Sequence, residues 1–188
     1  MSPEWLTAIG TLGTFIVIAA SAVAALMQLR HMRAGNQIVA LNEVRETIES
    51  SAFQETLLFL RELPQRLTDP EIRRSLADRT FPAEYQRLRT LANFFEHLGT
   101  LVKKHIIDAD IAADLWGGVI LVNWYALAPI IANRRLAMDQ PAVWENFEYL
   151  AVLCQKFRER HPKGTFPRGI ERMPAPEIWP EVSGKDAR

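Results

Sequence analysis

The run LTAIGTLGTFIVIAASAVAALMQL, residues 6–29, contains no Asp, Glu, Lys, Arg or His. As an α-helix it would be about 36 Å long, enough to cross a hydrocarbon core of about 30 Å with some tilt. A cleaved signal peptide has a shorter apolar part and a positively charged start, whereas Glu4 precedes this run. A core helix of a soluble protein shows a polar face over such a length. The run therefore predicts a transmembrane helix.

The charges beside the run predict its direction. Lys and Arg close to a span favour the cytoplasmic side, and they follow this run but do not precede it. An amphipathic tryptophan ring also stands at the N-terminal side, where it prefers the membrane interface. We therefore expect one crossing of the inner (cytoplasmic) membrane, with the N-terminus outside and the rest of the chain in the cytoplasm. The expected anchor is defined by Trp5, Leu6, Phe15, Leu29, Arg30 and Arg33.

Small and hydroxylated side chains fall near one face of this predicted span. They are Thr7, Gly10, Thr11, Thr14 and Ser21. Such residues let two helices approach closely and bond in lipid, which would allow self-association. Alternatively, each hydroxyl bonds back to the preceding turn of its own helix.

Composition limits what the rest of the chain does. Lys plus Arg and Asp plus Glu are equal at 22 each, so no net charge attracts nucleic acid. The single cysteine, Cys154, excludes an intrachain disulfide and a multi-cysteine metal site, and its apolar surroundings predict a small buried side chain. After the anchor (residues 1–33) we expect one domain over 34–160. Five prolines in residues 161–188 then predict an irregular tail.

The remaining apolar pattern is helical, and no segment alternates as a half-buried strand does. Ser50 is a candidate helix cap, Pro64 a helix end, Asp108 a second cap and Gly117 with Gly118 a stop. The segment 119–132 is too short for a second crossing and is predicted as the central core helix. We therefore expect an all-α bundle of five or six helices. The predicted helical segments of the bundle are 51–63, 71–78, 82–106, 111–116, 119–132 and 141–158, and a helix over 38–48, with a bend at 35–36, is expected to continue out of the membrane.

The body resembles a known family in four pieces of sequence. These are LANFFE at 91–96, KHIID at 104–108, NWY at 123–125 with Pro129 following, and ENFEYLA at 145–151. In this order and spacing, residues 36–158 resemble a bacterial family catalogued as domain of unknown function 4760. The resemblance implies a helical module next to a membrane, and it supplies no catalytic residues.

Few residues indicate a catalytic, metal-binding or cofactor-binding site. His97 and His105 are eight positions apart on the predicted helices, whereas a zinc-binding helix places two histidines four apart, so we expect no metal and no other cofactor. Phosphate-loop, dinucleotide and nucleophile-elbow motifs are absent from the sequence. Glutamates on helices could form a carboxylate pair for acid–base work, or they could orient helices by accepting bonds from arginines or from a helix N-terminus. These polar candidates are Glu96, Arg134, Arg135, Glu145 and Glu148.

The resulting hypothesis is a single-pass membrane protein whose cytoplasmic domain acts as a protein-interaction or accessory module. Its expected partners are the lipid bilayer and either another protein or a second copy bound through the span. One alternative is a membrane-anchored enzyme with an unrecognised carboxylate and arginine site. Another is a soluble chain whose first helix is covered in an oligomer. Aromatic residues that prove exposed would be interface candidates, among them Trp116, Trp124, Tyr125, Trp144 and Tyr149.

Overall fold

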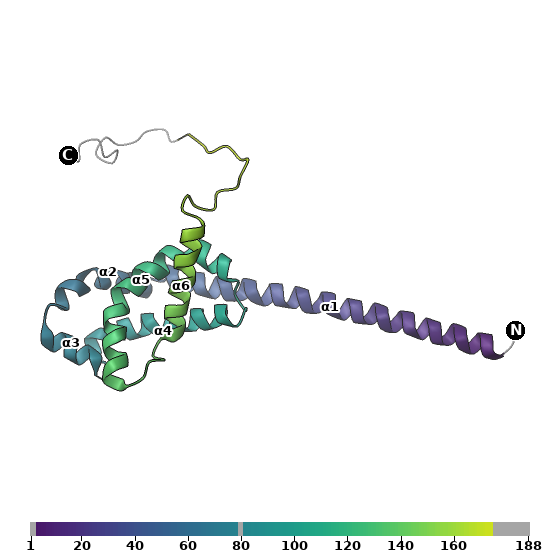
Figure 1. Ribbon diagram of the computed structural model, residues 1–188, viewed down its shortest axis with the longest axis horizontal. Helices are drawn as coiled ribbons and strands as arrows, with labels where there is room; N and C mark the ends of the chain where they lie inside the picture. Colours follow the sequence, from purple (N-terminus) through teal and green to yellow (C-terminus); the bar gives the residue numbers. More distant parts are fainter. Residues whose placement is uncertain (1–2, 79–80, 175–188) are drawn as a thin grey trace.

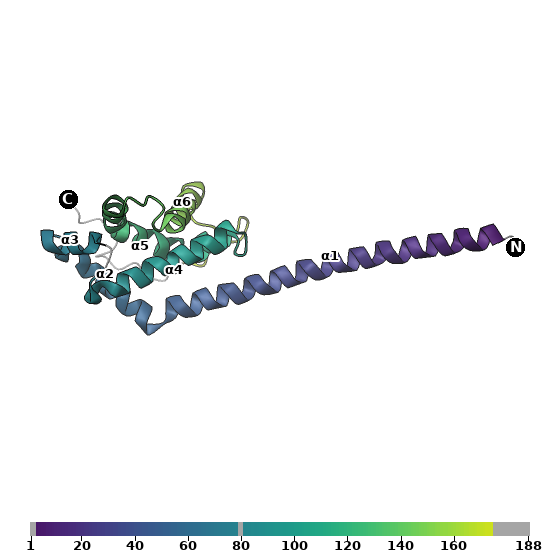
Figure 2. The ribbon, with the colours of Figure 1, turned by 90° about the horizontal axis from the view of Figure 1, so that it is seen from below.

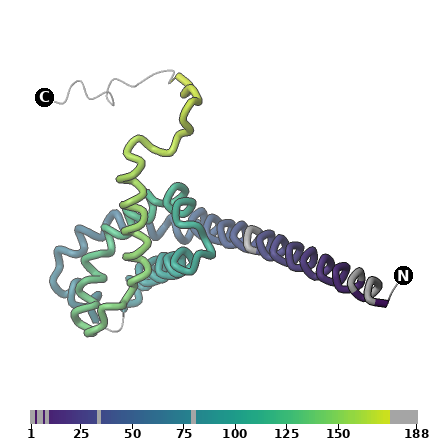
Figure 3. Tube along the Cα trace, turned by 45° about the vertical axis from the view of Figure 1, so that its right-hand side comes forward, coloured from purple at the N-terminus to yellow at the C-terminus, as the bar shows by residue number. Residues whose placement is uncertain are grey.

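The computed structural model describes residues 3–78 and 81–174, and over these residues it is all-helical, which confirms the predicted fold class. The helices are α1 (Pro3–Glu49), α2 (Ser51–Arg66), α3 (Pro70–Ala77), the 3₁₀ turn η1 (Ala83–Tyr85), α4 (Gln86–Lys103), α5 (Ala109–Met138) and α6 (Glu145–Arg160). Figure 1 shows α1 as a long rod and the other helices gathered around its C-terminal end. The described part of the tail, 161–174, has no helix and leaves the body beyond α6 (Figure 3).

Helix α1 is continuous through the predicted span and out of it. The bend predicted at 35–36 is absent, because the helix continues through Gly35. Figure 2 shows the rod running without interruption into the body. Its last turns join the core through Val44 and Ile48, which are 5% and 9% exposed. Ala40 and Leu41 are partly buried against the core, whereas the described side chains of the apolar run are exposed.

Two described helices are long and apolar enough to cross a membrane. In the first, Gly10–Glu49, none of the apolar window is buried, whereas 39% of the window in the second, Ala109–Met138, is buried. The second helix is α5, and it packs against α2, α3, α4 and α6. The inner side of α5 therefore forms the centre of the bundle, as expected for segment 119–132.

Local capping signals lie where the sequence placed them. The Ser50 hydroxyl accepts a bond from the backbone N–H of Phe53 at the start of α2, and Asp108 accepts from the N–H groups of Asp110 and Ile111 at the start of α5. Asp69 accepts in the same way from the N–H of Glu71 at the start of α3, which begins at Pro70, one residue before the predicted segment.

Several predicted helix boundaries are wrong: the helix expected to reach residue 106 ends at Lys103, and the one expected to end at 132 continues to Met138. Pro64 does not end α2, which continues to Arg66, since a proline in the last turn removes only one helical bond. Gly117 and Gly118 do not stop a short helix, because α5 runs through them to Met138. Helix α5 packs against α6 at this point, where a Cβ on Gly117 would make ordinary contact with the Cβ of Cys154 at 3.7 Å, so this packing outweighs the low helix propensity of glycine. Helix α6 begins at Glu145, not near Pro141.

Aromatic rings join α2, α4, α5 and α6 in the core. The rings of Phe95 and Phe147 stack with their centroids 4.8 Å apart, and Trp124 meets Phe147 edge-on at 5.1 Å. Phe53 of α2 packs edge-on against Phe95 at 6.1 Å. Such pairs add to the burial energy of each ring, so Phe147 at the start of α6 is tied to both α4 and α5.

Candidate functional site

The start of α6 is a polar joint, held by side chains of α4. Its N-cap residue, Trp144, has φ 53° and gives no side-chain cap, although its Nε1 donates to Asn93 Oδ1 at 2.8 Å. Side chains of this size rarely adopt positive φ. The first N–H groups of α6 therefore need acceptors from another part of the chain.

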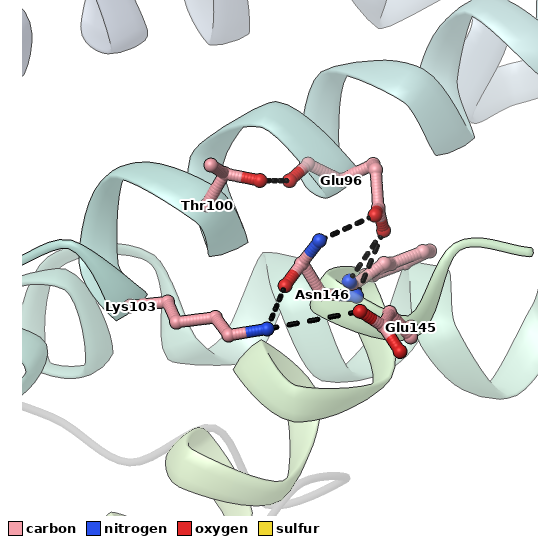
Figure 4. Close-up of polar contacts among 6 residues, drawn as sticks. Glu96, Thr100, Lys103, Glu145 and Asn146 are labelled. Atoms are coloured by element: carbon pink, nitrogen blue, oxygen red, sulfur yellow. Dashed lines mark hydrogen bonds and ion pairs between the residues drawn. The ribbon is translucent and has the colours of Figure 1, made fainter. Parts of the chain in front are cut away.

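Glu96 on α4 supplies those acceptors (Figure 4). Its Oε2 accepts the backbone N–H groups of Asn146 and Phe147, both at 2.9 Å. Its Oε1 accepts the amide Nδ2 of Asn146 at 2.6 Å. A carboxylate at a helix N-terminus also interacts favourably with the helix dipole. Glu96 thus caps α6 across 50 residues of sequence and holds α6 on α4.

Two further residues complete this joint. Lys103 Nζ donates to Asn146 Oδ1 at 3.1 Å and lies 3.7 Å from Glu145 Oε1 (Figure 4). Gly99, one turn after Glu96, lies directly against the backbone of Asn146. A Cβ built on Gly99 would be 2.0 Å from the carbonyl oxygen of Asn146. The glycine is therefore required for the close approach of α4 and α6.

The two arginines of α5 hold other segments. Arg134 is buried and donates to the backbone carbonyls of Leu76, at 3.0 Å, and Asp78, so it fixes the end of α3 on α5. Burial lowers the pKa of Arg134, the nearby Arg89 lowers it further, and Asp78 partly offsets both. Its guanidinium also lies over the ring of Phe81, 4.7 Å from the centroid.

Arg135 connects α5 to α6. Its Nε donates to the carbonyl of Val143 at 2.9 Å, and its Nη1 pairs with Glu148 Oε2 at 2.6 Å. The structure therefore places Glu96 and Glu145 at one joint and Glu148 at another. Each of the three carboxylates is bound by a different group. They therefore hold helices in place, and they do not converge as a catalytic pair would.

A cavity of about 410 Å³ lies between the α1–α2 corner and α4. Its lining includes Glu55 and Arg87 but none of the predicted polar candidates, which stay at the helix joints. Among the residues that the structure describes, no group of three or more His, Cys, Asp or Glu could hold a metal ion.

Sequence reasoning named Glu96 but missed Gly99, Lys103 and Asn146. A glycine inside an apolar helical pattern was the available signal for Gly99, because such a residue often marks a close approach. Nothing local indicates that Asn146 is the group it approaches.

The anchor residues are exposed where the structure describes them. Phe15 is 68% and Leu29 53% exposed, and Arg30 is exposed too, whereas the side chains of Trp5, Leu6 and Arg33 lie outside the described residues. In the hydroxyl stripe, Thr7, Thr11 and Thr14 each donate to the backbone carbonyl four residues earlier, at 2.9–3.1 Å. Gly10 and Ser21 are exposed on the same helix.

Cys154 is buried on α6 and is 2% exposed. Burial raises the pKa of its thiol to about 12. Only the thiolate is nucleophilic, so Cys154 is expected to resist a water-soluble maleimide in the folded protein at neutral pH. Counting modified thiols by mass spectrometry should show no label in the native protein and full label in denaturant. Labelling at equal rates in both conditions would contradict this burial.

A comparison with protein-family models matches residues 15–153 to Domain of unknown function (DUF4760). The match starts inside the apolar run, earlier than the resemblance in the body alone suggested. Neither the comparison with curated proteins nor that with solved structures finds a significant match. Because residues 15–153 make up more than half of the chain, the protein belongs to the DUF4760 family, a family whose function is unknown.

Proposed function

We propose that the protein is a single-pass membrane protein whose cytoplasmic helical body acts as a protein-interaction or accessory module. The observation that carries the anchor is the exposure of α1. Its large apolar side chains, such as Leu12, Val17 and Leu26, are 62%, 65% and 62% exposed, with no protein around them. Lipid would cover such a surface, whereas water would not favour it.

The polar candidate side chains of the body support an interaction or accessory role over catalysis. These carboxylates and arginines hold helices to one another, so they stabilise the shape of the body and do not form a reactive cluster. The basic residues after the apolar run favour the cytoplasmic side for that body. The family match, which begins within the apolar run, supports treating anchor and body as one unit.

Membrane fractionation tests the anchor. The full chain is expected in the membrane pellet after a high-pH carbonate wash and in the soluble fraction only with detergent. A variant that begins at Asn36 lacks the apolar run and is expected to lose that detergent requirement. Recovery of the full chain without detergent would refute the anchor.

Protease treatment of vesicles tests the orientation. In right-side-out vesicles the body is expected to be protected, and in inverted vesicles it is expected to be digested. The opposite pattern would place the body outside and would contradict the direction inferred from the flanking arginines.

A further inference from the structure

Positive charge is concentrated at the end of α6 and in the described tail. Lys plus Arg equal Asp plus Glu over the whole sequence, at 22 each. Residues 160–174, called the basic segment here, contain four cations and one acid, Glu171, which leaves a net charge of +3. The four cations are all exposed, and they are Arg160, Lys163, Arg168 and Arg172. This segment therefore attracts anions, although the chain as a whole does not.

The basic segment also forms a cavity of about 590 Å³. All four of its cations line this cavity, and no carboxylate of the described residues does. Arg160 is paired with Asp110 of α5, 2.8 Å away. Lys163 and Arg168 have no ion pair within the part of the chain that the structure describes. At least two cations of the cavity are therefore available to an anionic ligand.

Two contacts hold the basic segment on the first turns of α5. One is the pair between Arg160 and Asp110, and in the other the Thr165 hydroxyl donates to Asp114 Oδ1 at 2.6 Å. Figures 1 and 2 show the turn between α4 and α5 at the end of the body that faces the free part of α1, and the described tail extends to the same end. Lys104, which is exposed after the last turn of α4, adds another cation there.

That end of the body is close to the proposed membrane. Among the described apolar side chains of α1, Ala40 is the first that packs against the core. It follows Leu29 by 11 residues, or about 16 Å of helix. Lipid headgroups occupy about 5–7 Å of that length. The remaining distance of about 10 Å is close to the Debye length of about 8 Å in physiological salt, so the leaflet and the cations attract each other.

Apolar side chains stand between the cations of the basic segment. Phe166, Ile170 and Met173 are 45%, 61% and 92% exposed. A membrane surface accepts both kinds of side chain, because it has phosphate groups at its headgroups and an apolar boundary beneath them. A soluble phosphate would gain from the cations alone. The combination of charge, apolar groups and position therefore favours lipid as the ligand.

We propose that the basic segment binds the phosphate groups of anionic lipids in the same bilayer that α1 enters. The proposal rests on the proposed anchor and on the cytoplasmic side of the body. The lipid bilayer would then hold the body at two places, at α1 and at the basic segment. Only the second contact depends on the charge of the lipids.

Fluorescence quenching of the full chain in vesicles tests this contact. A neutral dye is attached at Met173→Cys, because Met173 is 92% exposed, and the buried Cys154 stays unlabelled. Lipids with a nitroxide on the headgroup quench the dye on contact. Quenching is expected to be about twice as strong with phosphatidylglycerol present as in phosphatidylcholine alone, and high salt should remove the difference. Equal quenching in the two kinds of vesicle would overturn the proposal.

A dye at Leu58→Cys is the matched control for position. Leu58 is 58% exposed and belongs to α2, which lies at the other end of the body (Figure 1). Its quenching is expected to be weak in both kinds of vesicle. An equal response to phosphatidylglycerol at Leu58→Cys would contradict a contact made by the basic segment.

Charge variants identify the groups that bind. Lys163→Gln combined with Arg168→Gln, in the Met173→Cys chain, is expected to remove the response to phosphatidylglycerol. Arg61→Gln combined with Arg74→Gln removes as much charge from exposed positions of α2 and α3, and it should leave the response unchanged. Equal circular dichroism spectra would show that both variants fold. A full response in the first variant would overturn the proposal.

Inorganic phosphate separates a lipid from a soluble ligand. When phosphate replaces chloride at constant ionic strength, quenching is expected to persist. Its loss would assign the cavity to a soluble phosphate and would overturn the proposal.

Flotation of the full chain with phosphatidylcholine vesicles reports on the anchor separately, because these vesicles have no net charge. A chain that floats without responding to phosphatidylglycerol would refute the lipid contact of the basic segment and keep the anchor. A chain that does not float would refute the anchor, and with it the shared bilayer.

Discussion

Replacing Gly99 with alanine is expected to lower the free energy of unfolding by about 2 kcal/mol or more. The added methyl would meet the Asn146 carbonyl oxygen at 2.0 Å and its carbon at 2.6 Å. Backbone atoms cannot rotate aside as a side chain can, so α6 must move away from α4. Alanine favours a helix over glycine by about 1 kcal/mol, which offsets only part of this cost. Thermal unfolding followed by circular dichroism should show a midpoint lower by about 4–8 °C.

Gly118→Ala is the matched control for that prediction. Gly118 is also inside a helix, but a Cβ there would meet nothing within 4 Å. The same substitution is therefore expected to leave stability unchanged or to raise it by up to about 1 kcal/mol. If Gly99→Ala were as harmless as Gly118→Ala, α4 and α6 would not approach as closely as described.

Replacing Glu96 with alanine is expected to lower the free energy of unfolding by about 3 kcal/mol. The change removes three hydrogen bonds to a charged acceptor and leaves two backbone N–H groups of α6 without a partner. Trp144, at the N-cap, has no side-chain oxygen that could replace the carboxylate. Chemical denaturation of the full chain in detergent would measure the loss.

Two further variants separate the causes. Glu96→Gln keeps an oxygen acceptor but loses the charge that favours the helix N-terminus, so a smaller loss of about 1 kcal/mol is expected. Glu62→Ala removes a glutamate whose side chain is 64% exposed and whose pair with Arg66 is solvated, and it should change stability by less than about 0.5 kcal/mol. Equal effects of Glu96→Ala and Glu62→Ala would remove the basis for assigning the cap to Glu96.

The two large predictions concern one joint, so they are coupled. If Gly99→Ala pushes α6 away, the hydrogen bonds that Asn146 and Phe147 donate to Glu96 are already lost in that variant. The double variant should then be less destabilised than the sum of the single variants. Strict additivity would indicate that Gly99 and Glu96 act on separate parts of the structure.

Much of the fold could be predicted from local signals. Ser50 and Asp108 cap helices because their short side chains reach the N–H groups of the next turn, and that geometry depends only on neighbouring residues. The boundary predicted at Pro64 was wrong because a proline near a helix end costs little, whereas the one at Gly117 was wrong because local preference competes with tertiary packing. At Gly117 the contact with α6 involves Cys154, far along the chain, so no local pattern reveals it.

The candidate site was also predictable only where its signals are local in sequence. The chemistry of Glu96 suggests that it can hold a helix N-terminus, but not which helix, because its partners are 50 residues away. The exposed apolar side of α5, with Leu115, Val122 and Tyr125, could not be predicted for a different reason. When both sides of a helix are apolar, periodicity cannot distinguish the side that faces the core from the side that faces outward.

The continuity of α1 fixes the orientation of the body relative to the apolar run. Since the helix runs unbroken from the apolar run to Val44 and Ile48 in the core, no flexible hinge separates the two. Each residue of an α-helix turns by about 100° and rises about 1.5 Å. The number of residues between the apolar run and the core therefore sets the rotation of the body about the axis of α1 relative to that run. In the proposed membrane arrangement, one residue more or fewer would turn the body by about 100° relative to the anchor and change its height by only about 1.5 Å.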